Sequence, residues 1–162
     1  MTVLKVVLCG DGGVGKSTLT RAFLGREPPE RLTVGADFYT YEYKGKKFLI
    51  VDIGGEERFR FILPLVAKKA VGLIYVFDLS RPSTLFSLVE WDIHAKATAK
   101  PGAITFVIGN KADLKRKVDN AAIEEVCGKI NPVKYYESTA LDRERVRKIF
   151  NEIFNTIASR TS

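Results

Sequence analysis

Short apolar runs alternate along the 162-residue chain with stretches whose apolar residues recur at helical spacing. Six runs have the length and composition of β-strands: Val3–Cys9, Phe38–Lys44, Phe48–Ile53, Leu73–Leu79, Ile104–Gly109 and Val133–Glu137. Several are apolar throughout, which is typical of strands covered by helices on both faces. The second run instead alternates, with tyrosines at every other position (39, 41 and 43), and a Lys-Gly-Lys turn follows it. This pattern predicts a hairpin with the third run.

The intervening stretches show helical periodicity. One helix is expected to begin near Lys16, and one from about Asn120 is expected to stop at Gly128 and Pro132. Another should begin near Pro82, with its apolar face formed by Leu85, Leu88, Val89 and Ile93. The last helix has the clearest apolar stripe, formed by Val146, Ile149, Phe150, Ile153, Phe154 and Ile157.

Strands that alternate with helices predict βαβ units and an α/β fold. We expect a six-stranded, mostly parallel, doubly wound sheet with one antiparallel edge strand and about five helices. The length predicts one domain over residues 1–162. Ligands of such sheets bind beyond the carboxyl ends of the strands, where the motifs below are found.

The segment after the first run, Gly10 to Ser17, matches the phosphate-loop pattern G-x-x-x-x-G-K-S. Glycines let backbone N–H groups wrap a polyphosphate, and the following helix directs its positive end at the anion. The Lys16 ammonium can reach the β- and γ-phosphates, and the Ser17 hydroxyl can bind Mg²⁺. A glycine-rich turn that matches by chance is the alternative. The predicted phosphate contacts are Asp11, Gly12, Gly13, Val14, Gly15, Lys16, Ser17 and Thr18.

A second motif, Asn110-Lys111-Ala112-Asp113, follows the fifth run. The Asp113 carboxylate can accept two hydrogen bonds from guanine, whereas adenine offers no such donor pair, so this residue would select GTP over ATP. The Lys111 stem can cover the purine, and Asn110 can tie this loop to the phosphate loop. Alone, the motif could also be a turn that caps the next segment.

With both motifs, the chain resembles a small GTPase of the Ras superfamily, most similar to the Ras and Rab branches and with a P-loop NTPase fold. The likeness covers essentially all 162 residues. Three further segments resemble the switch I, switch II and guanine-bordering loops of that family: Thr33-Val34-Gly35-Ala36-Asp37-Phe38, Asp52-Ile53-Gly54-Gly55-Glu56-Glu57-Arg58-Phe59 and Glu137-Ser138-Thr139-Ala140.

The resemblance implies roles for these residues. Thr33 and Ser17 would bind Mg²⁺ directly and Asp52 through water, and the N–H groups of Thr33 and Gly55 would reach the γ-phosphate. The catalytic set would be Glu56, Lys16, Thr33 and Gly55. The implied base contacts are Asn110, Lys111, Asp113, Leu114, Ser138, Thr139 and Ala140. Taken singly, Thr33 or Asp52 could equally be a capping or turn residue.

The implied function is a GTP/GDP-binding molecular switch with slow intrinsic GTP hydrolysis. Its regulators and effectors would dock on Thr33–Lys44 and Gly54–Leu65. The alternatives are a nucleotide-locked interaction module with negligible hydrolysis, and a nucleic-acid-associated GTPase.

Glu56 stands where the family usually has the glutamine that orients the attacking water. A carboxylate can accept a hydrogen bond from water but cannot donate one to the transition state. Glu56 is therefore either a water acceptor in a slow reaction or a solvent-facing residue without a catalytic role.

Two further departures lie in the switch regions. Gly54 replaces the usual alanine, which gives switch II more backbone freedom and suggests ordering by a partner, or is a neutral change. The segment Gly25–Leu32 lacks an aromatic residue to stack on guanine, which predicts fast nucleotide release, while Pro28 and Pro29 add stiffness. Arg31 is either an arginine finger in cis or, as we favour, a solvated loop residue.

Composition narrows the remaining choices. Apolar residues make up 46% and charged residues 28% of the chain, which excludes collagen, coiled-coil, disordered and disulfide-rich classes. The net charge of +7 is dispersed, so we expect solvated faces rather than a nucleic-acid patch. Cys9 and Cys127 indicate buried free thiols in a reducing compartment, and the lone His94 has no metal-ligating neighbour.

The ends of the chain carry expectations about localisation. The first residues indicate a core strand rather than a signal peptide, and no run is long enough to span a membrane. Thr2 and a terminus without cysteine lack the signals for a lipid anchor. We therefore expect a cytoplasmic protein, recruited to membranes, if at all, by a partner.

Overall fold

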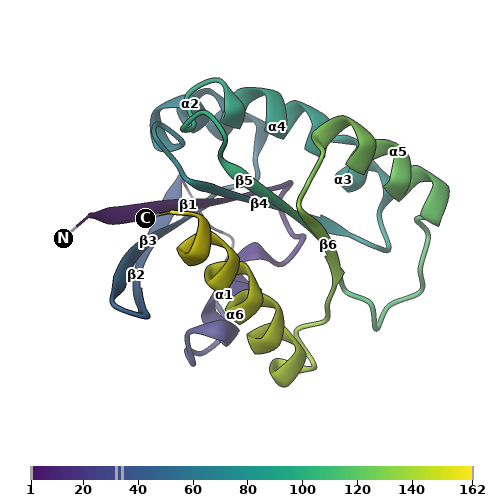
Figure 1. Cartoon of the computed structure of the whole chain (residues 1–162). Coiled ribbons are helices and arrows are strands. Elements are labelled where there is room, and N and C mark those ends of the chain that lie inside the picture. Colours follow the sequence, from purple (N-terminus) through teal and green to yellow (C-terminus); the bar gives the residue numbers. More distant parts are fainter. Residues whose placement is uncertain (1, 32, 34, 162) are drawn as a thin grey trace.

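A six-stranded sheet forms the centre of the computed structural model, which describes residues 2–31, 33 and 35–161 (Figure 1). Leu32 and Val34 of the predicted switch I region therefore lie outside the described residues. The strands lie in the order β2-β3-β1-β4-β5-β6. Their bounds are β1 Val3–Cys9, β2 Ala36–Tyr43, β3 Lys46–Ile53, β4 Gly72–Asp78, β5 Ile104–Asn110 and β6 Lys134–Glu137.

The pairing of the strands confirms the predicted α/β topology. β2 pairs antiparallel with β3, and the other pairs of described strands are parallel. The β2–β3 hairpin turns at Lys44 and Gly45, which both have positive φ (49° and 76°), as a two-residue hairpin turn requires. β4 and β5 are buried at every position, as expected for central strands with helices on both faces.

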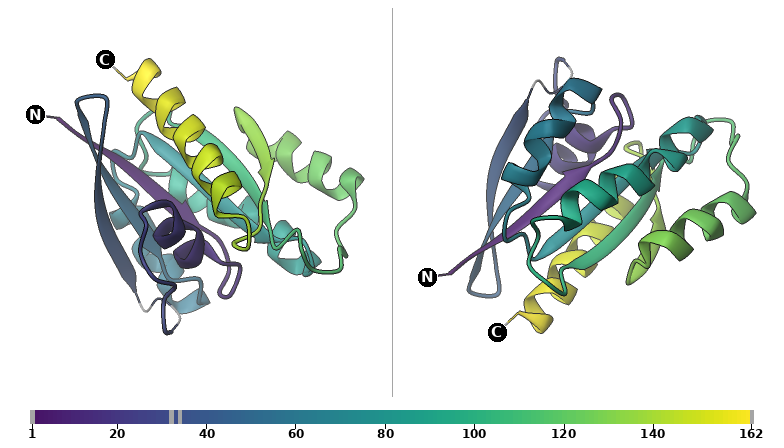
Figure 2. Two further views of the ribbon diagram at one scale, coloured as in Figure 1. Left: turned by 90° about the horizontal axis from the view of Figure 1, so that it is seen from below. Right: turned by 90° about the horizontal axis from the view of Figure 1, so that it is seen from above.

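Helices cover both faces of the sheet (Figures 1 and 2). One face carries α1 (Lys16–Phe23) and α6 (Arg143–Arg160), and all six predicted stripe residues of α6 are buried. The other face carries α2 (Leu63–Val66), α3 (Pro82–Phe86), α4 (Leu88–Lys96) and α5 (Asn120–Ile130). A 3₁₀-helix, η1, spans Glu57–Ile62. With α3 and α4 counted as one helix interrupted at Ser87, the described residues form the five α-helices predicted.

Two predictions about helices are wrong. Ile93 is 64% exposed, because it lies on the solvent side of α4, whose buried residues are Leu88, Trp91, Asp92 and Ala95. α5 continues through Gly128 to Ile130. Its stop is Asn131, which adopts the left-handed conformation (φ 58°) common after a helix C-terminus.

The two cysteines are free thiols, with Cys9 buried and Cys127 only half-buried. Nε2 of His94 lies 3.7 Å from Oε1 of Glu90. The described residues contain no cluster of three or more His, Cys, Asp or Glu side chains that could hold a metal. Within the described residues, none of the helices combines the length and apolar character needed to cross a bilayer.

Candidate nucleotide-binding site

The predicted phosphate loop connects β1 to α1, beyond the carboxyl end of β1. Gly15 caps α1 with φ 100°, a conformation that side chains other than glycine rarely adopt. A Cβ atom there would also lie 2.3 Å from Nδ2 of Asn110, which donates a hydrogen bond to the Val14 carbonyl oxygen at 2.8 Å. The phosphate loop and the Asn110 loop are therefore packed directly against each other.

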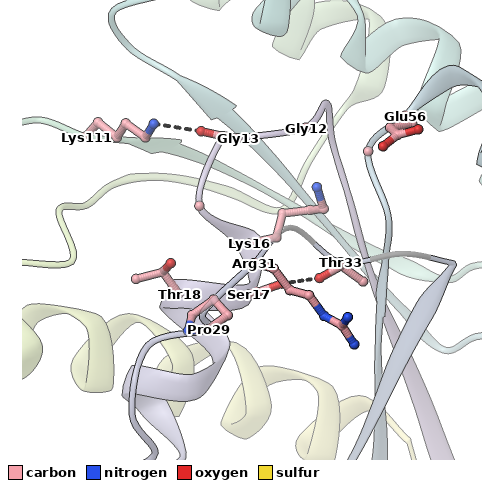
Figure 3. Close-up of a pocket in the computed structure, with 12 residues that line it drawn as sticks. Gly12, Gly13, Lys16, Ser17, Thr18, Pro29, Arg31, Thr33, Glu56 and Lys111 are labelled. Atoms are coloured by element: carbon pink, nitrogen blue, oxygen red, sulfur yellow. Dashed lines mark hydrogen bonds between the residues drawn. The ribbon is translucent and has the colours of Figure 1, made fainter.

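A cavity of about 180 Å³ opens beside this loop (Figure 3). It is lined by residues 12–13 and 15–18 of the loop and by Pro29, Arg31, Thr33, Gly55, Glu56 and Lys111. The structure thus brings the four predicted catalytic residues to one cavity, although they come from three separate segments of the chain.

Lys16 lies at the floor of the loop and is buried. Its Nζ donates hydrogen bonds to the carbonyl oxygens of Gly10 at 2.7 Å and Asp11 at 3.2 Å. Burial lowers the pKa of this ammonium, and the nearby Asp52 carboxylate opposes that shift. A buried cation held by two carbonyl oxygens of the loop is suited to bind an anion that enters the loop.

Three oxygen-bearing side chains lie together beside the loop, those of Ser17, Thr33 and Asp52. The Ser17 and Thr33 hydroxyl oxygens are 2.5 Å apart, and Ser17 donates a hydrogen bond to Oδ2 of Asp52. Oδ2 also accepts from Thr33 at 3.3 Å. Asp52 is fully buried, and its Oδ1 has no hydrogen-bond partner among the described residues.

This donor set fits Mg²⁺, which prefers hard oxygen ligands and retains several waters. Burial raises the pKa of the Asp52 carboxyl, with Lys16 opposing the rise. A divalent cation next to this group would stabilise its charged form, and the unpaired Oδ1 is available to a metal-bound water.

The predicted guanine loops meet at the carboxyl ends of β5 and β6. Asn110 links them, because its Oδ1 accepts a hydrogen bond from the Ser138 hydroxyl at 2.9 Å while its Nδ2 bonds Val14. Thr139 donates to Oδ1 of Asp113 at 2.6 Å. The Asp113 carboxylate is exposed on its loop, where a base can reach it.

Of the implied base contacts, Lys111 lines the cavity beside the phosphate loop, and the others do not. Ala140 lines a neighbouring cavity of about 630 Å³ together with Thr18, Pro28 and Leu141. Thr18 contributes to both cavities, so they lie next to each other. Asp113, Leu114, Ser138 and Thr139 line neither. Pro28 gives the neighbouring cavity an apolar wall from a segment without aromatic residues.

The switch II segment lies against the phosphate loop. A Cβ atom on Gly55 would lie 2.1 Å from the Gly12 nitrogen, so the two backbones are in contact. The N–H of Gly54 donates to the Gly35 carbonyl oxygen at 2.6 Å, which connects switch II to switch I. A Cβ atom on Gly54 would lie 2.7 Å from the Thr33 carbonyl oxygen, so this close approach favours glycine.

Glu56 and Arg31, the two charged switch residues with a possible role in hydrolysis, both point away from the phosphate loop (Figure 3). Glu56 lines the cavity, but its carboxylate pairs with Nε of Arg58 at 2.8 Å and its side chain points away from Lys16 (Figure 3). The Arg31 guanidinium points away from Gly12 and Gly13 in the same view. This arrangement agrees with the interpretation of Arg31 as a loop residue.

Asp78 is a buried carboxylate that the sequence analysis missed. It pairs with Arg81 at 3.1 Å and with Lys111 at 3.3 Å. Arg81 in turn donates to the Gly12 carbonyl oxygen at 2.9 Å, and Lys111 to that of Gly13 at 2.6 Å. Burial alone would raise the pKa of Asp78, but hydrogen bonds from Ser80 and Arg81 lower it overall. The sequence signal that could have identified Asp78 is its place as a carboxylate at the end of an apolar strand.

The sequence also offered no indication that Asp11 contacts Arg60 and Trp91. Asp11 was predicted as a phosphate contact through the loop, but its carboxylate accepts hydrogen bonds from Trp91 Nε1 at 3.0 Å and Arg60 at 3.3 Å. No local pattern in the sequence indicates these contacts, since the residues are 49 and 80 positions away from Asp11.

Comparisons with known proteins agree with this geometry. A sequence model described as the Ras family matches residues 5–159. The chain is 32% identical to the Ras-related protein Rab-5B of Plasmodium falciparum, over 98% of this chain and 80% of that protein. It is 34% identical to the Ras-related protein RABA5a of Arabidopsis thaliana, over 96% and 76% of the two chains. It is 33% identical to the Ras-related protein SEC4 of Saccharomyces cerevisiae, over 97% and 74%. The chain therefore belongs to the Ras family of small GTPases.

Proposed function

We propose that this GTPase is a GTP/GDP-dependent switch whose intrinsic hydrolysis is slow. The observation that carries the proposal is that three groups of predicted site residues lie at the carboxyl ends of the strands. These groups are the Lys16 loop, the Ser17–Thr33–Asp52 cluster and the loops that hold Asp113. We also propose that residues 1–162 act as one GTPase domain, since the central sheet takes strands from Val3 to Glu137.

The phosphate loop would bind the β- and γ-phosphates through its backbone N–H groups and the Lys16 ammonium. Ser17, Thr33 and, through water, Asp52 would hold Mg²⁺, which when bound offsets negative charge on the β- and γ-phosphates. The N–H groups of Thr33 and Gly55 would donate to the γ-phosphate. Loss of that phosphate would release both segments, which is how the surface would change between the two states.

Asp113 would select guanine. Its exposed carboxylate can accept hydrogen bonds from the N1–H and N2 amine of the base in place of the Thr139 hydroxyl that it now accepts. The Ala140 N–H would face O6 of guanine. Pro28 is in a position to give an apolar contact without aromatic stacking, which supports faster nucleotide release than in relatives with a stacked aromatic residue.

Glu56 is the reason to expect slow hydrolysis. In the reaction, a water oxygen forms a bond to the γ-phosphorus, the bond from that phosphorus to the bridging oxygen breaks, and GDP and phosphate leave. Glu56 could accept a hydrogen bond from that water, but its pairing with Arg58 competes, and its charge repels the phosphate.

A nucleotide-locked interaction module is the second candidate, and the Glu56–Arg58 ion pair favours it. In this alternative the carboxylate stays with Arg58 and no residue orients the water. Partners would then recognise a state that only nucleotide exchange can change.

Regulators and effectors would dock on Thr33–Lys44 and Gly54–Leu65. Phe38, Phe61 and Leu65 expose large apolar side chains within these segments (61%, 78% and 75%), which supports a docking role. We place the protein in the cytoplasm, with recruitment to membranes through a partner.

Phosphate release under multiple turnover separates the two candidates. The protein is loaded with excess GTP and Mg²⁺, and free phosphate is followed for several hours. Release of more than one phosphate per protein supports the slow switch. Release that stops below one equivalent, with intact GTP still bound, supports the locked module.

A further inference from the structure

Arg60 joins switch II to both the phosphate loop and α4. One terminal nitrogen of its guanidinium lies 3.3 Å from Oδ1 of Asp11, and the other lies 2.8 Å from Oε2 of Glu90. The guanidinium also lies 5.1 Å from the centre of the Trp91 ring. The side chains of Arg60 and Asp11 are only 18% and 21% exposed, so their contact is largely shielded from water and stronger than a surface pair, whereas Glu90 is 56% exposed.

Asp11 is a fixed partner for this arginine. Its Oδ1 accepts a second hydrogen bond, from Nε1 of Trp91 at 3.0 Å, and Trp91 is a fully buried residue of α4. The carboxylate therefore cannot follow a moving Arg60 without losing the indole. We call the contacts among Asp11, Arg60, Glu90 and Trp91 the latch.

The latch supplies polar side-chain contacts that tie η1 to the phosphate loop and α4. None of the six residues of η1 is buried, and Phe61 within it is 78% exposed. The apolar packing of η1 is limited to partly buried side chains, Ile62 against the core and Phe59 against Gly54. Among the described residues, the side-chain hydrogen bonds and ion pairs from η1 to another secondary-structure element or to the phosphate loop all come from Arg60.

Gly55 lies five residues before Arg60 on the same switch II segment. The Gly55 backbone already contacts the loop, since a Cβ atom there would lie 2.1 Å from the Gly12 nitrogen and 2.3 Å from the Asp11 carbonyl carbon. Asp11 thus meets switch II twice, through its backbone at Gly55 and through its carboxylate at Arg60.

We propose that Arg60 is a positioning residue that sets the preference of the site for GTP over GDP. The inference rests on the proposed function, in which the Gly55 N–H donates to the γ-phosphate. A contact that stabilises the closed position of Gly55 adds to the affinity only of a ligand that needs this position. GTP needs it and GDP, which lacks the γ-phosphate, does not.

The test compares two affinities in the same variant. Dissociation constants for GDP and for a non-hydrolysable GTP analogue are measured with Mg²⁺ in the unchanged protein, Arg60→Ala and Arg60→Lys. The matched control is Arg147→Ala, which removes an exposed arginine of α6. We expect Arg60→Ala to weaken the GTP analogue about tenfold and GDP less than about twofold, within the usual range of coupling between sites.

Arg60→Lys should recover part of the loss, because an ammonium can pair with Asp11 but cannot also pair with Glu90 and cover the indole. Trp91 is the only tryptophan in the sequence, so its fluorescence reports the latch directly. The emission should differ between the GDP and GTP-analogue forms of the unchanged protein, and this difference should vanish in Arg60→Ala.

Equal weakening of both nucleotides by Arg60→Ala would show a merely structural role and overturn the inference, as would unchanged affinities for both. If the unchanged protein binds neither guanine nucleotide, the proposed function fails first, and this outcome is distinct from a failure of the latch alone.

Discussion

The Glu56 carboxylate lies 2.8 Å from Nε of Arg58, and both side chains are largely exposed (47% and 65%). Exposed ion pairs of this kind contribute about 1 kcal/mol or less, so nucleotide binding can break the pair at low cost. In the structure Glu56 is on Arg58, and we expect bound nucleotide to allow it to turn toward the phosphate cavity that it lines.

Replacing Glu56 tests which position matters for hydrolysis. We predict that Glu56→Gln hydrolyses GTP about tenfold faster than the unchanged protein, because the amide can donate as well as accept and carries no charge. Glu56→Ala should be about tenfold slower, because it loses the acceptor for water. Single-turnover hydrolysis of pre-bound GTP measures all three rates. Equal rates would remove Glu56 from the mechanism.

Replacing Asp113 tests the selection of guanine. In Asp113→Asn the amide nitrogen cannot accept a hydrogen bond from the base, so the affinity for GTP should fall by about tenfold to a hundredfold. Xanthosine triphosphate carries an oxygen in place of the N2 amine and should bind this variant better than GTP does. Competition with a fluorescent nucleotide gives both affinities. A variant that still prefers GTP over xanthosine triphosphate would contradict the assigned role.

Replacing Asp78 tests the support of the phosphate loop. Asp78→Asn should release GDP about tenfold faster, since Arg81 and Lys111 lose the charge that holds them on the Gly12 and Gly13 carbonyl oxygens. The free energy of unfolding should fall by about 1 to 2 kcal/mol. Stopped-flow release of a fluorescent GDP analogue is the measurement. Glu124→Gln, an exposed acid-to-amide change on α5, serves as the control and should leave the rate unchanged.

Glu137 gives a prediction for the dependence of stability on pH. Burial would raise the pKa of its carboxyl, but hydrogen bonds from Arg116 at 2.9 Å and Tyr135 at 2.7 Å outweigh burial and lower it. A lowered folded-state pKa means that the stabilisation is complete above the unfolded-state pKa of about 4.3 and is lost as the pH falls through the folded-state value.

We therefore expect Glu137→Gln to be less stable than the unchanged protein by roughly 1 kcal/mol at pH 7. The difference should shrink as the pH falls below about 4. Urea unfolding at pH 7, 5 and 3 measures it. A difference that stays constant across this range would mean that the charge of Glu137 contributes nothing.

The positions of the strands along the chain and the antiparallel β2–β3 hairpin could be predicted from the sequence, because both depend on local patterns. The apolar runs and the tyrosine alternation specify β1 to β6, and the Gly10 to Ser17 spacing predicts a phosphate loop between β1 and α1. The assignments to Mg²⁺, guanine and the γ-phosphate stay predictions that the experiments above address.

Contacts between distant residues could not be predicted in the same way. Asp11 meets Arg60 and Trp91 only because η1 and α4 pack beside the loop, and no spacing along the chain encodes this. The misassigned position of Ile93 has a related cause, since packing selects the face of Leu88, Trp91 and Ala95, and an apolar residue type alone does not distinguish that face from Ile93. Gly128 was misread because tertiary packing of α5 overrides the weak helix propensity of one glycine.

The most direct test of the account is a titration of the nucleotide-free protein with GTP, GDP and ATP in the presence of Mg²⁺. The account predicts tight binding of both guanine nucleotides and binding of ATP that is weaker by at least about a thousandfold, because adenine leaves Asp113 without its donors. Equal affinity for GTP and ATP would contradict it.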